Sequence, residues 1–198
     1  MNLATLDGEV YYYKSFYPRL KATALFNEFS SYQEYKQRKI KLFGKQFMSP
    51  RLEAFFAKEK QHYSYSGNEL ESNSFTPRIQ KICMDIEKFT DNKFNSVLIN
   101  VYRNESDSNG WHADDEKELG INPFIASLSL GEKRRIHFKH KTTKDKFHID
   151  LEHGSLLIMK GTLQHHWKHQ IPKSKKFLGK RINLTFRTIM DCSNLYCF

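Results

Sequence analysis

The strictest alternation of polar and apolar residues lies near the C-terminal end of the chain, in residues 181–187. One parity is wholly polar and the other wholly apolar: Arg181, Asn183, Thr185 and Arg187 against Ile182, Leu184 and Phe186. A period of two predicts a strand whose successive side chains point to opposite faces. If the polar face is turned inward, its two guanidiniums need partners, and their paired donors suit a small dicarboxylate. A surface strand with its polar face in water is the alternative.

The same periodicity predicts a series of short strands after residue 94. They are 96–102, 124–130, 136–139, 146–151, 155–159, 164–171 and 181–188. Turn signals such as Gly131-Glu132 and Lys160-Gly161 separate them. Seven or so short strands of this kind predict a β-sandwich or a jelly roll.

The N-terminal half contains helical periods as well. Residues 6–17 predict one short strand, and apolar residues at helical spacing predict a helix over residues 18–30. Thr76 and Pro77 form a helix start, followed by a stripe that we expect to be buried: Ile79, Ile82, Cys83, Ile86 and Phe89. We expect one α+β domain, mainly β, over residues 1–198, with helical support and a lid in residues 1–95 and the β-core in residues 96–190.

Composition and charge narrow the class of partner. The 198 residues are 39% hydrophobic and 14% aromatic, which is typical of a globular protein. A formal net charge of +10 favours an anionic partner, most often nucleic acid, over the alternative of a merely soluble basic surface. Residues 36–50 interleave basic and large apolar side chains, which suits either a nucleic-acid lid or an ordinary strand with lysines in solvent.

The cysteines and the apolar runs bear on the cellular compartment. Cys83, Cys192 and Cys197 form no Cys-x-x-Cys pair, which favours reduced thiols. No apolar run approaches 18 residues, and the N-terminus lacks a secretion signal. We therefore expect an intracellular monomer with no membrane partner, located in the nucleus if the source is eukaryotic and in the cytoplasm if it is bacterial.

A His-x-Asp pair suggests a metal site. In an extended segment His112 and Asp114 share one face, and a second imidazole would complete the 2-His-1-carboxylate set that leaves positions open on Fe(II). The pattern occurs again at His148 and Asp150, where parity places both side chains on the wet face of a strand. The candidates for the second imidazole are His153, His165, His166 and His169; strand parity disfavours His166, and the choice between His165 and His169 stays open.

Several motifs in a fixed order carry a family resemblance. They are Asn100-x-Tyr102, Trp111-His112-x-Asp114-Asp115-Glu116, His153-Gly154-Ser155-Leu156-Leu157-Ile158-Met159, Trp167-x-His169-x-Ile171-Pro172 and Arg181-x-Asn183-Leu184-Thr185-Phe186-Arg187. From about Phe43 to Ile189 the chain resembles the AlkB family of Fe(II)- and 2-oxoglutarate-dependent nucleic-acid demethylases, in particular its animal DNA-repair homologues. The combination is highly specific, although each motif alone is not.

The resemblance implies a double-stranded β-helix (jelly-roll) core with a nucleotide-recognition lid, and roles for single residues. It makes His112, Asp114 and His169 the iron ligands, which resolves the choice between His165 and His169. Arg181 would bind the distal carboxylate of 2-oxoglutarate, and Arg187 would lie near the carboxylate bound to iron, with O₂ as cosubstrate. The other residues that it implies for the 2-oxoglutarate site are Asn100, Tyr102, Asn183 and Thr185.

The resemblance also implies substrate contacts. Phe43, Gly44 and Lys45 match a hairpin that probes the duplex, Pro50-Arg51 a backbone contact, and Tyr63, Ser64 and Tyr65 a lid that stacks on the base; Asp115 and Glu116 would face the flipped base. Two departures bear on the substrate. Phe56-Ala57-Lys58 replaces a Tyr-Gly-Asp-like turn, and Trp111 precedes the first iron ligand as in some homologues only, which leaves the strand preference open.

By resemblance, the expected activity is repair of 1-methyladenine and 3-methylcytosine in DNA. The methyl group is hydroxylated with conversion of 2-oxoglutarate to succinate and CO₂, and formaldehyde is released from a base turned out of its stack. An RNA demethylase of the same family is the alternative. A protein side chain as substrate is disfavoured by the basic segment 36–51, and a non-catalytic binder of damaged nucleic acid by the complete set of ligands and arginines.

Overall fold

The computed structural model describes residues 1–190 except residues 5, 43–44, 60–61 and 66–67. The side chains of residues 40–45 and 60–71 also lie outside the description. Within the described residues, no helix is long and apolar enough to cross a membrane.

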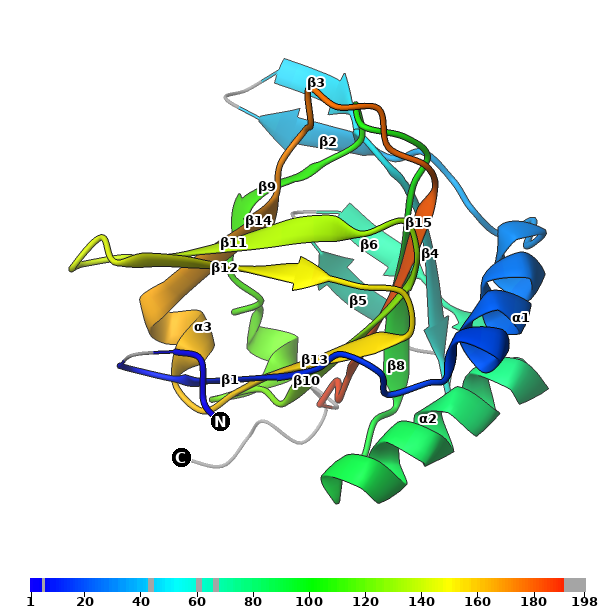
Figure 1. Cartoon of the computed structure of the whole chain (residues 1–198), viewed down its shortest axis with the longest axis horizontal. Helices are drawn as coiled ribbons and strands as arrows, with labels where there is room; N and C mark the ends of the chain where they lie inside the picture. The colour runs from blue at the N-terminus through cyan, green and yellow to red at the C-terminus, as the bar shows by residue number, and fades with distance from the viewer. Residues whose placement is uncertain (5, 43–44, 60–61, 66–67, 191–198) are drawn as a thin grey trace.

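Two β-sheets form the core of the molecule (Figure 1). The major sheet has the order β1 (Glu9–Tyr13), β13 (Ser155–Lys160), β10 (Ile125–Gly131), β15 (Arg181–Arg187), β8 (Ser96–Tyr102), β4 (Leu52–Ala57) and β7 (Asn73–Ser74). The minor sheet has the order β12 (Lys146–Leu151), β11 (Arg134–His140), β14 (Trp167–Ile171) and β9 (Asn109–His112). Among these described strands, β4 and β7 pair in parallel, and all the other pairs are antiparallel.

Apolar side chains from both sheets fill the space between them. Phe138 of β11 and Leu151 of β12 belong to the same buried cluster as Ile125 of β10 and Leu157 of β13. Alternation along each strand sends the intervening side chains to the other face. The mainly β, two-sheet architecture confirms the fold class expected from the sequence.

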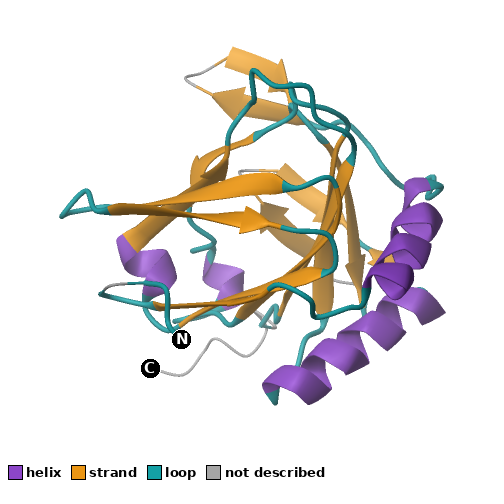
Figure 2. Ribbon diagram, viewed as in Figure 1, coloured by secondary structure: helices purple, strands orange, loops and turns teal. Residues whose placement is uncertain are grey.

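Two helices cover the outer face of the major sheet (Figure 2). They are α1 (Arg19–Ser30) and α2 (Pro77–Thr90), both close to the predicted ranges. The Thr76 hydroxyl caps α2 by accepting from the Ile79 N–H at 3.2 Å. Phe89 departs from the expected buried stripe: it is 48% exposed and packs edge-on against Tyr13 at the helix end.

Three segments differ from the sequence expectation. Residues 164–166 were expected in a strand, but they lie in the short helix α3 (Leu163–His166), so the strand parity applied to His165 and His166 was wrong. In the N-terminal half, β1 and β4 belong to the major sheet. β4 was missed because both of its faces are buried, so its sequence shows no alternation.

The lid region contributes two hairpins outside the two main sheets. They are β2 (Lys39–Leu42) with β3 (Lys45–Met48), and β5 (His62–Tyr65) with β6 (Asn68–Glu71). Phe56 and Ala57 form no lid turn, because they are buried and complete β4. A 3-10 helix, η1 (Lys117–Leu119), follows the His-x-Asp segment.

Candidate metal centre

The minor sheet brings the three expected iron ligands together. His112 ends β9, and its cross-strand partner in β14 is His169; Asp114 lies two residues after His112. One ligand atom from each residue lies within 4.8 Å of those of the other two. The two imidazole centroids are 4.2 Å apart, and His112 Nε2 lies 3.6 Å from Asp114 Oδ1. This distance range allows one metal ion to contact all three groups.

Both imidazoles are held in the neutral form that binds metals. Burial lowers the pKa of His169 to about 3, and burial also lowers the pKa of His112. The Nδ1–H of His112 donates to the carbonyl of Gly110 at 2.8 Å, which leaves the lone pair on Nε2. Metal-bound histidines commonly fix their second nitrogen in this way.

Asp114 divides its two oxygens between different partners. Oδ2 accepts from Arg187 Nη2 at 2.6 Å and Nε at 3.2 Å, whereas the buried Oδ1 has no hydrogen-bond partner among the described residues. Burial alone would raise the pKa of Asp114, but the charge and hydrogen bonds of Arg187 outweigh it and hold that pKa below its usual range. A charged carboxylate with one open oxygen beside two neutral imidazoles fits a divalent cation such as Fe(II).

The metal centre opens into a cavity with about 430 Å³ of empty space. All four polar residues of β15 line it, so the polar face of that strand is turned inward. The other lining residues are Tyr102, Asn109, His112, Asp114, Ser127, Ile136, Leu151, Met159, His169 and Ile171.

Arg181 is a buried cation at the other end of the polar face of β15. Its Nη2 donates to Ser129 Oγ at 2.9 Å, and its guanidinium lies over the Tyr102 ring at 5.2 Å. The buried Nε and Nη1 atoms have no hydrogen-bond partner in the described part of the chain. Burial lowers the pKa of Arg181 to about 10, so the group stays charged at neutral pH. Two open donors on a buried cation fit the carboxylate of a 2-oxo diacid.

The remaining expected cofactor residues differ in their surroundings. Asn183 donates to Ser127 Oγ at 2.7 Å and accepts from Thr185 Oγ1 at 3.0 Å, which orders the cavity wall. Asn100 does not line the cavity; its Oδ1 accepts from Arg51 Nε at 2.9 Å. Asn100 is the cross-strand partner of Asn183, so it lies beside the cavity on the same face of the sheet, where it holds Arg51.

The residues expected to contact the substrate differ in burial and in their partners. Arg51 is buried and pairs with Glu53, so its guanidinium is turned into the protein. Asp115 is exposed, with Oδ2 3.5 Å from Lys141 Nζ. Burial first, and then the charge of Asp114, raise the pKa of Glu116 to about 7. Phe43 and Gly44, and the side chains of Lys45, Tyr63, Ser64 and Tyr65, lie outside the described residues.

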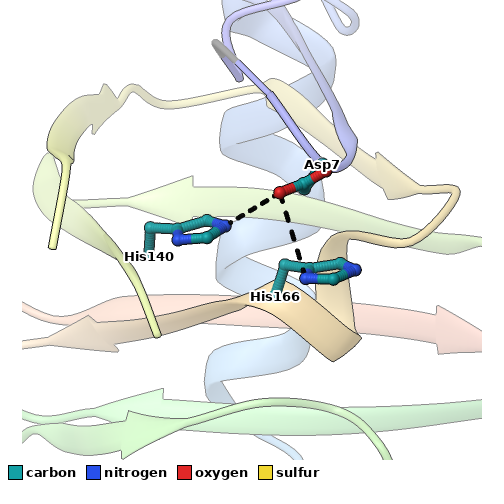
Figure 3. A group of neighbouring side chains, drawn as sticks. All are labelled: Asp7, His140 and His166. Carbon is teal, nitrogen blue, oxygen red and sulfur yellow. Dashed lines mark hydrogen bonds and ion pairs between the residues drawn. The ribbon is translucent and has the colours of Figure 1, made fainter. Parts of the chain in front are cut away.

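A second group of potential metal ligands comprises Asp7, His140 and His166 (Figure 3). One ligand atom from each of these residues also lies within 4.8 Å of those of the other two. Asp7 Oδ2 lies 3.2 Å from His140 Nε2 and 4.0 Å from His166 Nδ1. However, His140 Nδ1 accepts from the backbone N–H groups of Thr142 and Thr143, at 3.3 and 3.0 Å. The proton of a neutral His140 is therefore on Nε2, where it bonds to Asp7. These contacts fit a hydrogen bond that links Asp7 to the minor sheet, and they do not fit a metal site.

The other histidine candidates lie away from the metal centre. His165 is exposed in α3, and His153 accepts from the Gly131 N–H beside α1. His148 and Asp150 occupy the outer face of β12, as parity predicted, and Asp150 pairs with Arg135.

Sequence reasoning missed four residues that support the site. Ser129 binds Arg181, Gln164 Oε1 accepts from the Asp114 N–H at 2.9 Å, and Asn109 Nδ2 lies 3.3 Å from His112 Nε2. Arg134 lies over Tyr102 at 5.3 Å. Ser129 falls on the inward parity of β10 and could have been found from that pattern, whereas Gln164 could not, because its segment was assigned to a strand.

Comparison with known proteins agrees with this geometry. The family model described as "2OG-Fe(II) oxygenase superfamily" matches residues 9–187. Human "Alpha-ketoglutarate-dependent dioxygenase alkB homolog 3" is 40% identical in an alignment of 153 positions that covers 72% of this chain and 53% of that protein. Bovine "DNA oxidative demethylase ALKBH2" is 34% identical in an alignment of 189 positions that covers 90% of this chain and 68% of that protein.

The chain spans about half the length (53%) of the AlkB homologue 3 proteins that it matches. Among solved structures, "The structure of OsALKBH1" superposes with a TM-score of 0.63 at 16% identity, covering 93% of this chain and 100% of that one, which shows the shared fold. Together with the family match over residues 9–187, these similarities establish that the chain belongs to the 2OG-Fe(II) oxygenase superfamily.

Proposed function

We propose that this protein is an Fe(II)- and 2-oxoglutarate-dependent dioxygenase that removes N-methyl groups from nucleic-acid bases. The observation that carries the proposal is the single cavity in which His112, Asp114 and His169 converge while Arg181 offers two open donors. A structural ion pair would explain Arg187 and Asp114, but it would not explain a second buried cation facing the same space.

Each residue of the cavity has a distinct task. With O₂, the bound iron and 2-oxoglutarate supply the oxidising equivalent that hydroxylates the methyl carbon, and 2-oxoglutarate leaves as succinate and CO₂. His112, His169 and Asp114 Oδ1 would hold the metal, and Arg181 would bind the far carboxylate of the cosubstrate. Arg187 keeps Asp114 ionised and orients it. Apolar side chains such as Ile136 and Met159 limit water in the cavity.

The proposed substrate is DNA carrying 1-methyladenine or 3-methylcytosine. The bovine and human ALKBH2 relatives are named DNA oxidative demethylases, and the human one is 34% identical over 90% of this chain. A net charge of +10 and a surface hollow lined by residues such as Lys133, Arg135, Lys173 and Lys176 suit a polyanion. Asp115 and Glu116, beside the metal ligands, are the carboxyl groups that would meet a cationic base.

Formaldehyde release is the direct test. Purified protein with Fe(II), 2-oxoglutarate and ascorbate should release formaldehyde from oligonucleotides that contain either lesion. His112→Ala and Arg187→Ala should each lower the rate by about 10- to 100-fold or more. The matched controls are His165→Ala and Arg78→Ala, which remove an exposed imidazole and an exposed guanidinium outside the cavity. Full activity of both site variants would refute the assignment.

RNA is the second candidate substrate, because a basic surface attracts either polymer. Matched DNA and RNA oligonucleotides with the same lesion, mixed in one reaction and resolved by mass spectrometry, would separate the two.

We further propose a monomer located inside the cell, in the nucleus or the cytoplasm according to the source; the buried free thiol of Cys83 is compatible with a reducing compartment. Light scattering and localisation of a tagged protein test these two points.

A further inference from the structure

The outer face of the minor sheet holds a row of lysines that repel one another. Strand register places Lys139 of β11 directly opposite Lys146 of β12 on one side and Lys168 of β14 on the other. We call these three residues the lysine row. Like charges at directly opposed positions destabilise a sheet. The sheet therefore bears a local electrostatic cost at this row.

The rest of the same face shows how the sheet neutralises charge elsewhere. Two rows away, Arg135 lies opposite Asp150 and donates to its carboxylate at 2.7 Å. Within the part of the chain that the structure describes, no member of the lysine row has a carboxylate within ion-pair distance. The row thus retains three unneutralised charges, which an anionic ligand would neutralise.

An exposed tryptophan lies at the end of this surface. Trp111 is 42% exposed in β9, the edge strand of the minor sheet. Because neighbouring side chains in a strand point to opposite faces, Trp111 faces outward where His112 faces the metal centre. One surface hollow is lined by Trp111, Lys139, His140, Lys141, Lys144 and Lys168. The hollow therefore combines a flat aromatic surface with several cations.

A charged contact connects this hollow to the active site. Lys141 Nζ donates to the backbone carbonyl of Gln164 at 2.9 Å, and it lies 3.5 Å from Asp115 Oδ2. Asp115 directly follows the metal ligand Asp114 in the chain. A nucleic-acid strand that inserts one base into the cavity would therefore pass the edge strand β9. It would reach the outer face of the minor sheet close to the metal centre.

We propose that this face binds the single-stranded segment that flanks the base in the active site, with the lysine row contacting phosphates and Trp111 stacking on an unpaired base. This inference rests on the proposed function, since it assigns a path to the same substrate. Stacking on aromatic side chains together with a basic groove is how proteins bind single strands without reading their sequence. In a duplex the faces of interior bases are already covered, so the surface favours single strands.

Intrinsic fluorescence provides a site-specific test, because the chain has two tryptophans and the other, Trp167, is only 1% exposed. Iron-free protein is titrated with an unmodified single-stranded oligothymidylate of about 12 nucleotides, so the result does not depend on demethylation. We expect saturable quenching that is lost in Trp111→Leu, and about tenfold weaker binding for that variant. A duplex of the same length should quench less.

The lysine row is tested with a double variant, Lys139→Ala with Lys168→Ala. Affinity should fall about tenfold at moderate salt, and the slope of log K against log salt should become shallower by about 1.4, because two phosphate contacts are lost. Lys21→Ala with Lys81→Ala is the matched control: it makes the same charge change on α1 and α2, where both lysines pair with Asp85. The control should bind as the unmodified protein does.

Several outcomes would overturn the inference. They are no quenching, equal effects of the two double variants, equal binding of duplex and single strand, or quenching by vesicles of anionic phospholipid but not by the oligonucleotide. Demethylation without Trp111 quenching would leave the proposed function intact and refute this surface alone. Quenching without demethylation would support the surface and count against the proposed reaction.

Discussion

At the scale of single residues, the orientation of Asp114 depends on two groups that are not themselves expected metal ligands. Arg187 occupies Oδ2, and Gln164 accepts from the backbone N–H, so the carboxylate can turn only Oδ1 toward the two imidazoles. Gln164 is itself buried, with its amide nitrogen 3.9 Å from Met159 Sδ. The orientation of one metal ligand is thus set from α3, a different segment of the chain.

Replacing Gln164 by leucine should therefore weaken the metal centre. The substitution leaves the buried N–H of Asp114 without an acceptor, which costs about 1–3 kcal/mol of stability. Loss of a group that orients a metal ligand typically lowers metal affinity about 10- to 100-fold. Urea unfolding and Mn(II) titration measure the two effects. Gln164→Glu retains the acceptor oxygen and serves as the control; equal loss in both variants would contradict the assigned role.

The buried histidines predict a stability that falls in acid. The pKa of His169 drops from 6.5 to about 3 on folding, so between these values the unfolded state binds more protons and the folded state loses stability as pH decreases. His112 acts in the same direction. One such group contributes up to about 1.4 kcal/mol per pH unit. Urea unfolding of iron-free protein should therefore show lower stability at pH 5 than at pH 7.

Glu116 changes the stability of the folded state with pH in the opposite direction from the two histidines. Its pKa rises from 4.5 to about 7 on folding, so between these values the folded state binds more protons and gains stability as pH decreases. Glu116→Gln removes this gain and should steepen the loss of stability between pH 7 and pH 5, whereas His169→Gln should make it shallower. Parallel pH profiles for the unmodified protein and both variants would contradict these assignments.

At the scale of elements, Arg134 of β11 connects three segments around the cavity. Its Nη2 donates to the carbonyls of Asp107 and Pro172, each at 2.7 Å, and its Nη1 donates to that of Asn104 at 3.1 Å. Its guanidinium also lies 5.3 Å from the centre of the Tyr102 ring, which the guanidinium of Arg181 approaches to 5.2 Å. The loops that precede β9 and follow β14 are thereby fixed to the minor sheet.

We predict that Arg134→Met loosens both loops and weakens cosubstrate binding. It leaves three carbonyls without their donor, so stability should fall by about 2–4 kcal/mol, and the KM for 2-oxoglutarate should rise several-fold because Tyr102 and Arg181 lose their support. Thermal unfolding and steady-state kinetics test this. Arg135→Met is the adjacent control; its exposed pair with Asp150 contributes about 0–1 kcal/mol. Similar effects of the two substitutions would refute the role of Arg134.

The elements could be predicted where one face is wet or helical periodicity is strong. β12, which has one wet face, has the predicted bounds, and α1 and α2 lie within one or two residues of theirs. β8 also has the predicted bounds although all of its residues are buried, because it is rich in the β-branched residues that favour strands. β4 is buried on both faces too, but it contains no β-branched residue, so neither alternation nor composition marked it as a strand. The turn at α3 was taken for a strand because four residues are too few to show a helical period.

The candidate site was predictable only in part from local pattern. Parity alone placed the polar face of β15, whose four residues line the cavity. The pairing of His169 with His112 depends on the contact of β14 with β9, which joins residues about sixty apart, and no local pattern encodes it. The choice of His169 over His165 came from the family resemblance. The surroundings of Asn100 and Arg51, both buried together, were not foreseeable from spacing.

At the scale of the whole molecule, ligand binding should raise thermal stability. Only the folded protein brings together the three expected metal ligands and the unpartnered donors of Arg181. Mn(II) and N-oxalylglycine, an unreactive analogue of 2-oxoglutarate, should therefore bind the native protein and not the unfolded chain. At 100 times Kd a ligand stabilises by about 2.7 kcal/mol. For a domain of this size that corresponds to a rise in Tm of about 5–10 °C.

His112→Ala should remove the Mn(II)-dependent part of that rise, and Arg181→Met the part that depends on the analogue. Differential scanning fluorimetry with and without a chelator measures both. His165→Ala should behave as the unmodified protein does. A Tm that does not respond to either ligand would show that the cavity does not bind them.

The pairing of β1 with β13 has a consequence for how the protein is made. The hydrogen-bonding partners of residues 9–13 are residues 156–160, which are translated almost 150 amino acids later. At about 5–20 residues per second, β1 waits roughly 7–30 seconds for its place in the sheet. His169 is translated later still, so the nascent polypeptide can hold iron with all three expected ligands only after β14 has been made.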